Sequence, residues 1–192
     1  MGKIVISETA SLDGVIQDPT GEEGFRFGGW FDPAKADREA WAKVLIAEAL
    51  GTEALLLGRR SYEYFVARGW VSRSGEWADR LRSLPKYVVS SAIENLEWQN
   101  STVLKGDVVD EVSKLKRKVN GDIVVYASGR LVPTLMEHDL VDELRLIVYP
   151  AVAGAGERLF GETGDRKIMH LIGARTVGDS LVSLTYQPVR EA

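Results

Sequence analysis

The chain has 192 residues, of which 45% are hydrophobic and 27% are charged, and its formal net charge is −4. This length and apolar content can build one hydrophobic core, so we predict a single domain over residues 1–192. The negative charge argues against a nucleic-acid partner, and no apolar run approaches the roughly 18 residues of a membrane span. The first residues lack a signal-like apolar stretch, so we predict a cytoplasmic protein with no membrane contact.

The sequence contains no cysteine, which excludes disulfides, a thiolate nucleophile and a cysteine-ligated zinc site. His138 lies between two acidic residues, but successive helical side chains point about 100° apart and do not converge on one ion. His170 lies in a strand pattern and is more typical of a sheet-face residue than of a catalyst. We therefore predict no metal.

Strand and helix patterns alternate in the first half of the chain, which is typical of a parallel sheet covered by helices. Short apolar runs predict strands at 4–6, 55–57, 87–89 and 102–104. Asp32-Pro33 predicts a helix that begins with Asp32 as N-cap and ends at Gly51. A second, shorter helix is predicted to bury Tyr62 and Phe65. The glycine-rich segment 18–29 is predicted to be a long loop of the kind that often forms a lid.

The second half continues this alternation of strands and helices and then ends in strands alone. Apolar residues at helical spacing predict a helix over 107–119, with Asp110 and Lys114 placed to pair on its polar side. The apolar run 123–126 predicts a strand buried on both faces, followed by a helix around Leu131. The last strands are predicted at 144–149, 168–172 and 181–186. Gly178-Asp179 is a hairpin signal, so the C-terminal end is predicted to be antiparallel.

The dipeptide Arg59-Arg60 follows a short buried strand and Gly58, and it opens a predicted helix beside Ser61. Backbone N–H groups at a helix start favour an anion, and each guanidinium offers a planar fork of donors to phosphate oxygens. Paired arginines near a helix start are also typical of a solvated surface. The pattern thus indicates a nucleotide site or an ordinary charged face.

Five segments together resemble the dihydrofolate reductase-like superfamily, particularly the reductase domain of bifunctional riboflavin biosynthesis proteins. They occur in the order expected for that family and span nearly the whole chain. The segments are Ser11-Leu12-Asp13-Gly14, Leu57-Gly58-Arg59-Arg60-Ser61-Tyr62-Glu63, Val89-Ser90-Ser91, Ala127-Ser128-Gly129-Arg130-Leu131, and Leu140 through Pro150 to Phe160. The resemblance implies an α/β three-layer fold, with a central, mostly parallel sheet, an antiparallel C-terminal strand and flanking helices.

The resemblance also implies that NADPH lies across the strand ends. Its 2′-phosphate would be held by the turn after the second strand and its pyrophosphate by the Ala127–Leu131 turn, where dihydrofolate reductases usually carry paired glycines and this chain does not. The implied cofactor-binding residues are Thr9, Ile16, Gly58, Arg59, Arg60, Ser61, Ser90, Ser91, Lys105, Ser128, Gly129, Arg130 and Leu131.

The substrate side is less well defined by these motifs. Trp30 resembles the tryptophan that lines it, and Asp13 is either a turn residue or a group that faces substrate. A dihydrofolate reductase needs a carboxylate on its first helix, and our candidate proton donor is Asp37. Asp32 is better explained as the helix N-cap.

By this resemblance the chain is expected to be an NADPH-dependent oxidoreductase that transfers hydride to a C=N or C=O group of a small heterocyclic or phosphorylated substrate. The leading substrate is 5-amino-6-(5-phosphoribosylamino)uracil. A reductase of a pterin, of dihydrofolate or of a xenobiotic is the first alternative, and a nucleotide-binding module without catalysis is the second. The family resemblance also implies a homodimer, which we predict to pair through the strand at 144–149 and the following segment.

Overall fold

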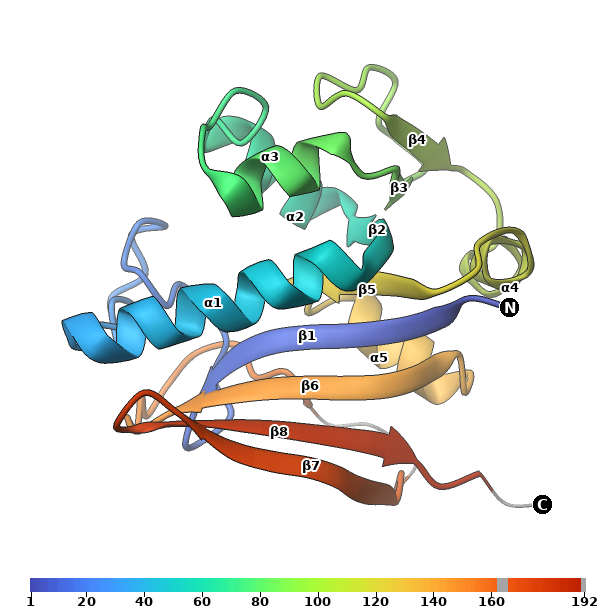
Figure 1. Cartoon of the computed structure of the whole chain (residues 1–192). Helices are drawn as coiled ribbons and strands as arrows, with labels where there is room; N and C mark the ends of the chain where they lie inside the picture. The colour runs from blue at the N-terminus through green and yellow to red at the C-terminus, as the bar shows by residue number, and fades with distance from the viewer. Residues whose placement is uncertain (162–165, 191–192) are drawn as a thin grey trace.

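The computed structural model describes residues 1–161 and 166–190. An eight-stranded sheet with the order β4-β3-β2-β5-β1-β6-β8-β7 forms its centre (Figure 1). The strands are β1 (Lys3–Ser11), β2 (Thr52–Gly58), β3 (Lys86–Val89), β4 (Ser101–Leu104), β5 (Asp122–Tyr126), β6 (Val141–Tyr149), β7 (Met169–Val177) and β8 (Leu181–Pro188). All neighbours from β4 to β6 pair in parallel, whereas β8 runs antiparallel to both β6 and β7. The predicted fold class is confirmed.

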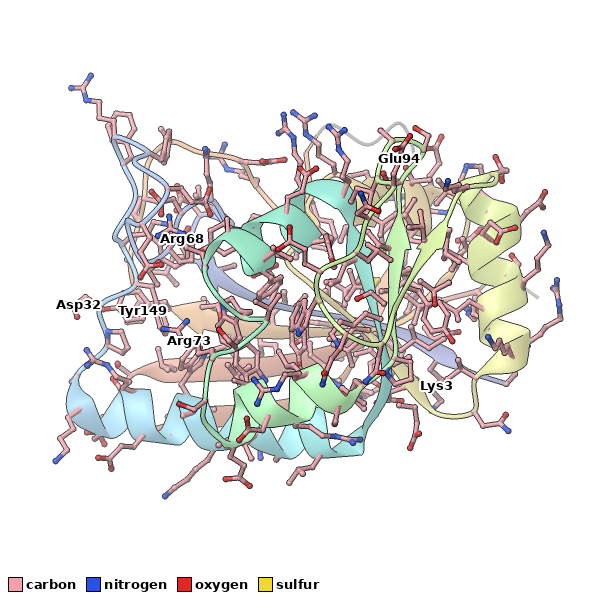
Figure 2. The ribbon with its side chains drawn as sticks, turned by 90° about the horizontal axis from the view of Figure 1, so that it is seen from above. Lys3, Asp32, Arg68, Arg73, Glu94 and Tyr149 are labelled. Atoms are coloured by element: carbon pink, nitrogen blue, oxygen red, sulfur yellow. The ribbon has the colours of Figure 1, made fainter. Side chains whose placement is uncertain are left out.

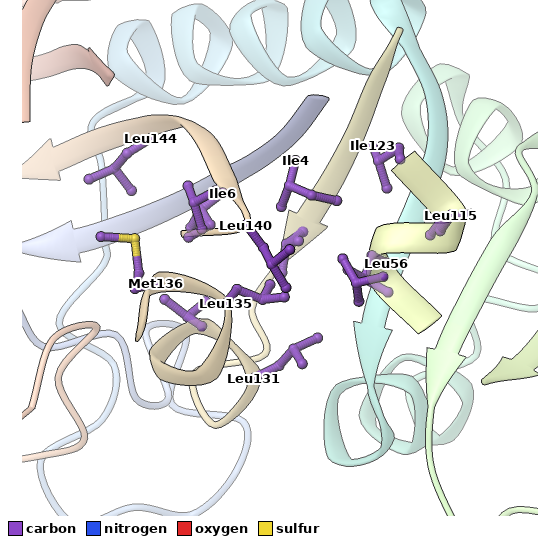
Figure 3. Packing of buried hydrophobic residues seen from close by; sticks show 14 of the residues in the cluster. Ile4, Ile6, Leu56, Leu115, Ile123, Leu131, Leu135, Met136, Leu140 and Leu144 are labelled. Carbon is purple, nitrogen blue, oxygen red and sulfur yellow. The ribbon is translucent and has the colours of Figure 1, made fainter. Parts of the chain in front are cut away.

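Helices cover both faces of the sheet (Figure 1). They are α1 (Lys35–Gly51), α2 (Arg59–Ala67), α3 (Glu76–Ser83), α4 (Val108–Lys118) and α5 (Leu131–Glu137). Residues of α1, α2 and α3 pack with the side chains of Val5, Leu55 and Leu57 in one buried cluster. Residues of α4 and α5 pack with Ile4 and Ile6 in another, on the opposite face (Figure 3). The alternation of side chains along β1 therefore assigns each residue to one layer.

Two local expectations were wrong, and one helix was missed. Helix α1 begins at Lys35 after Ala34, which makes no side-chain cap, so Asp32 is not its N-cap. Lys114 pairs with Glu111 at 2.7 Å instead of with the predicted Asp110. Helix α3 was not expected, because its two turns carry only a few apolar residues.

The two edges of the described sheet are β4 and β7. Strand β6 lies between β1 and β8 and bonds to both, so its backbone is not available to a second chain. The predicted pairing of two subunits through this strand is therefore wrong, and the homodimer itself stays a prediction. Within the described ranges, no helix is both long and apolar enough to cross a membrane.

Candidate functional site

A cavity of about 570 Å³ opens where β2 and β5 end beside β1. Its volume falls in the range of small-molecule and cofactor sites, and its place at the carboxyl ends of parallel strands is where open α/β sheets bind ligands. Helix starts, the turn after β5 and the loop after β1 form its walls. The lining residues include Glu8, Ile16, Gln17, Asp18, Glu23, Gly58, Arg59, Arg60, Ser61, Tyr64, Ala127, Ser128, Gly129, Arg130, Leu131 and Glu157.

The turn after β5 is the most constrained part of this wall. Ala127 and Ser128 both have positive φ angles, 52° and 65°, in a region that residues with a side chain rarely adopt. Ser128 holds the turn in place because its N–H donates to Ser61 Oγ at 2.8 Å and its Oγ accepts the N–H of Gly58 at 3.0 Å. These two bonds, here called the serine brace, tie the end of β5 to the end of β2. Backbone strain of this kind is concentrated at ligand sites.

Space at this turn is limited. A Cβ added at Gly129 would come within 3.0 Å of Ile16 Cδ1, whereas one added at Gly58 would make only ordinary van der Waals contacts. A glycine at position 129 therefore lets the backbone approach the loop after β1. In place of paired glycines, Ala127 and Ser128 adopt the left-handed conformation at a cost in backbone strain.

Positive charge gathers at the β2 end of the cavity. Arg59 and Arg60 open α2 directly after Gly58 and line the cavity with exposed side chains. Arg59 Nε lies 3.8 Å from Glu63 Oε1, a distance at which an exposed pair contributes little and can be displaced by a stronger anion. Arg130 adds a third guanidinium from the turn after β5. This end of the cavity suits a multiply charged anion such as a phosphate.

Glu8 lines the same cavity from β1, and the sequence reasoning missed it. Its Oε1 accepts the N–H of Thr9 at 3.1 Å, while the buried Oε2 has no hydrogen-bond partner among the residues that the structure describes. Burial raises the pKa of Glu8 to about 8, against the smaller opposing effect of the Thr9 and Ala127 backbone N–H groups. A neutral carboxyl facing a ligand cavity is a frequent feature of functional sites.

Several predicted site residues lie outside this cavity. Thr9 points to the opposite face of β1, where its hydroxyl accepts the N–H of Trp41 at 3.3 Å. Trp30 packs with Phe31 and Tyr149 on that side, and its indole N–H donates to Gln17 O at 3.0 Å. Figure 2 shows Tyr149 beside Asp32, at the end of the sheet opposite to Lys3. The aromatic group thus contacts the cavity wall through the bond from Trp30 to Gln17 and that from the Phe31 N–H to Pro19 O.

The predicted donors near β3 and β4 are also not brought to the cavity wall. The Ser90 hydroxyl accepts the N–H groups of Ala92 and Ile93, so it closes the turn after β3. Ser91 and Lys105 are exposed on the loops that follow β3 and β4. Their proposed roles toward a cofactor stay predictions that the cavity lining does not support.

Hydrogen bonds within the protein already occupy both predicted carboxylates, Asp13 and Asp37. Asp13 accepts the Ser11 hydroxyl at 2.7 Å and the N–H groups of Ala153 and Gly154, which lowers the pKa of Asp13 to about 2. This arrangement fits the turn role and not a contact with substrate. The guanidinium of Arg68, labelled in Figure 2, contacts the glycine-rich loop at Glu22.

Asp37 is buried at the start of α1 and does not line the cavity. Its carboxylate accepts the Ser180 hydroxyl and the N–H groups of Asp179 and Ser180, at the tip of the β7–β8 hairpin. These bonds, led by the one from the Ser180 hydroxyl, lower the pKa of Asp37. The assignment of Asp37 as proton donor is therefore corrected to a structural role. No cluster of three or more metal-binding side chains occurs in residues 1–161 and 166–190.

The sheet order defines an α/β protein of the dihydrofolate reductase-like fold, with a candidate ligand site across the ends of β2, β5 and β1. Residues 2–183 match the RibD C-terminal domain, and the chain belongs to that family. It is 26% identical to the uncharacterized protein YyaP of Bacillus subtilis (strain 168) over 188 residues, which are 96% of this chain and 94% of YyaP.

Two solved structures show the fold. A Shewanella sp. PV-4 protein provisionally assigned to riboflavin biosynthesis superposes with a TM-score of 0.75 at 22% identity, covering 98% of this chain and 99% of that one. Dihydrofolate reductase of Enterococcus faecalis, solved with NADP(H), gives a TM-score of 0.59 at 15% identity and covers 98% of this chain and 97% of its own.

Proposed function

We propose that this protein is an NADPH-dependent reductase that transfers hydride to a C=N or C=O group of a small heterocyclic or phosphorylated substrate. The observation that carries the proposal is the cavity itself, which Arg59, Arg60 and Arg130 line together with a strained turn. Family membership and a fold shared with an NADP(H)-bound reductase support the same assignment. The leading substrate is 5-amino-6-(5-phosphoribosylamino)uracil, in keeping with the family.

In this proposal NADPH supplies the hydride when it is bound, and the protein binds and orients the reactants. Arg59 and Arg60 meet the 2′-phosphate, because they lie together at the start of α2. The turn held by the serine brace receives the pyrophosphate, and Arg130 neutralises part of its charge. Asp18, Pro19 and Glu23 of the loop 18–29 form part of another wall of the cavity.

Calorimetric titration with NADPH and NADH tests the cofactor assignment. A charge-assisted hydrogen bond contributes roughly 1.5–3 kcal/mol, so two exposed contacts give a preference for NADPH of roughly tenfold to a thousandfold. Arg59→Ala should weaken NADPH binding and leave NADH binding nearly unchanged. Arg60→Ala should act in the same direction and less strongly.

The matched control is Arg117→Ala, which removes an exposed guanidinium from α4, away from the cavity. It should change neither affinity. Equal affinities for the two nucleotides in the wild type, or equal losses in Arg59→Ala, would remove the phosphate contact from the proposal. Nucleotide binding without turnover of the uracil substrate, dihydrofolate or a panel of carbonyl and imine compounds would favour a binding module.

A further inference from the structure

Glu8 is placed on the cavity side of β1 by the alternation of the strand. Ile4 and Ile6 point into the core beneath α4 and α5, and Glu8 is the next residue on that face. The ladder between β1 and β5 ends at the pair Ser7 and Tyr126, so β1 runs on without a neighbour on that side from Glu8. The carboxyl therefore lies where the end of β5 opens the sheet.

The strand order determines the sequence in which the polar groups of the cavity follow one another along a bound ligand. Arg59 and Arg60 follow β2, the turn with Ser128 follows β5, and Glu8 belongs to β1, in the spatial order β2-β5-β1. Two strand spacings, roughly 10 Å, separate the arginine end from Glu8. A dinucleotide that binds its phosphate at Arg59 and its pyrophosphate at the middle turn would extend its other ring toward Glu8.

We propose that Glu8 distinguishes the oxidised from the reduced cofactor by charge. Its carboxyl stays protonated beside the neutral reduced nicotinamide ring and becomes a carboxylate beside the cationic ring of NADP⁺. This inference rests on the proposed function and concerns only the nucleotide, not the substrate. It requires no bond change other than loss of the Glu8 proton to water.

The chemistry of the group supports this role. Oε2 is buried without a hydrogen-bond partner in the described part of the chain, so a bound ligand can supply its first contact. The raised pKa, about 8, keeps the isolated carboxyl mostly neutral at pH 7. An opposite charge within about 4–6 Å typically lowers a carboxyl pKa by 1–3 units, which is sufficient to ionise Glu8 at neutral pH.

Other charged groups around the cavity are Arg59, Arg60, Arg130, Asp18, Glu23 and Glu157. They face both forms of the nucleotide alike, and the two forms carry the same phosphates. Asp18 is held by the N–H groups of Glu23 and Phe25, which fixes it in the loop wall. A difference in proton release between NADP⁺ and NADPH therefore reports on the ring charge alone.

Calorimetry at pH 7 in buffers of different ionisation enthalpy measures the protons released on binding. We expect NADP⁺ to release roughly half a proton or more from the wild type and NADPH close to none. The affinity for NADP⁺ should rise between pH 6 and pH 8 relative to that for NADPH. Glu8→Gln keeps the shape of the side chain and should abolish both the difference in proton release and this pH dependence.

Glu23→Gln serves as the matched variant, because it neutralises another carboxylate of the same cavity. Equal proton release for the two nucleotides, or a difference that persists in Glu8→Gln and disappears in Glu23→Gln, would overturn the role of Glu8. Binding of both nucleotides with no such difference overturns this inference and leaves the proposed function intact. Failure of either nucleotide to bind the wild type overturns both.

Discussion

Two carboxylates in this protein, the buried Asp37 and the half-buried Glu8, have opposite surroundings. Asp37, beside the β7–β8 hairpin, accepts three hydrogen bonds from residues 179 and 180, and its pKa is lowered. Glu8, beside the turn after β5, accepts one from Thr9, and its pKa is raised to about 8. Burial alone therefore does not determine the charge of a carboxyl. The number of donors that the fold brings to it decides whether it is a structural anion or a neutral group open to a ligand.

The largest expected effect comes from removing the satisfied carboxylate. Asp37→Ala leaves the backbone N–H groups of Asp179 and Ser180 without their acceptor, so the midpoint of thermal unfolding should fall by several degrees. NADPH affinity should not change. Thermal unfolding followed by calorimetric titration of the folded protein measures both.

Glu39→Ala, on the exposed side of the same helix, is the control for Asp37→Ala and should leave the unfolding midpoint within about one degree. If Asp37→Ala lost nucleotide binding while its unfolding midpoint stayed unchanged, the structural role of Asp37 would be contradicted.

Replacing the Glu8 carboxyl should change the stability of the fold in the opposite direction. A group whose pKa is raised by folding favours the folded state most at low pH, and this contribution is lost as the pH rises from about 4.5 to about 8. Glu8→Gln cannot ionise, so it should unfold a few degrees above the wild type at pH 8.5 and close to it at pH 5.

Each pKa unit corresponds to about 1.4 kcal/mol, which limits the gain in Glu8→Gln to a few kcal/mol. Unfolding midpoints recorded across pH 5–9 without ligand test the sign. A gap between variant and wild type that stays constant over this range would show that Glu8 is not buried as a neutral group.

The smallest effect is expected at Asp13, whose carboxylate is held by the Ser11 hydroxyl and by two backbone N–H groups. Because the pKa of Asp13 is lowered to about 2, its contribution is present above its ordinary value near 3.8 and disappears as the pH falls toward 2. Asp13→Asn should be slightly less stable at pH 7, and the difference should narrow by pH 3.

Urea unfolding at pH 7, 5 and 3 measures the change in Asp13→Asn. Glu94→Gln, on the exposed loop labelled in Figure 2, is the comparison variant and should show no trend. A difference for Asp13→Asn that grew toward pH 3 would contradict the hydrogen bonding described for its carboxylate.

Much of the fold could be predicted from the sequence, because the apolar runs and helical spacings are local signals. The runs at 55–57 and 123–126 are buried strands, and Gly178 does form the hairpin turn with a positive φ of 65°. The start of α1 could not be predicted from Asp32-Pro33, because the chain there is held by distant contacts such as that from Tyr149 to Asp32 O. Helix caps compete with such tertiary contacts.

The site was predictable only in part. Gly58, Arg59, Arg60, Ser61 and the turn at 128–131 were found from motifs, and the structure brings them to one cavity. Glu8 was missed because a single acidic residue in a strand usually marks a solvated face. The alternation of side chains along the strand could have indicated it, since residues 4, 6 and 8 share a face and the first two are buried.

The serine brace has a consequence for how such proteins diversify. It joins the ends of β2 and β5 through one hydroxyl pair and two backbone N–H groups, without any contribution from the loop 18–29. Insertions and substitutions in that loop can therefore accumulate while the turn after β5 and the start of α2 keep their shape. Under the function proposed above, we expect relatives such as YyaP, which is 26% identical to this chain, to differ in substrate far more than in nucleotide.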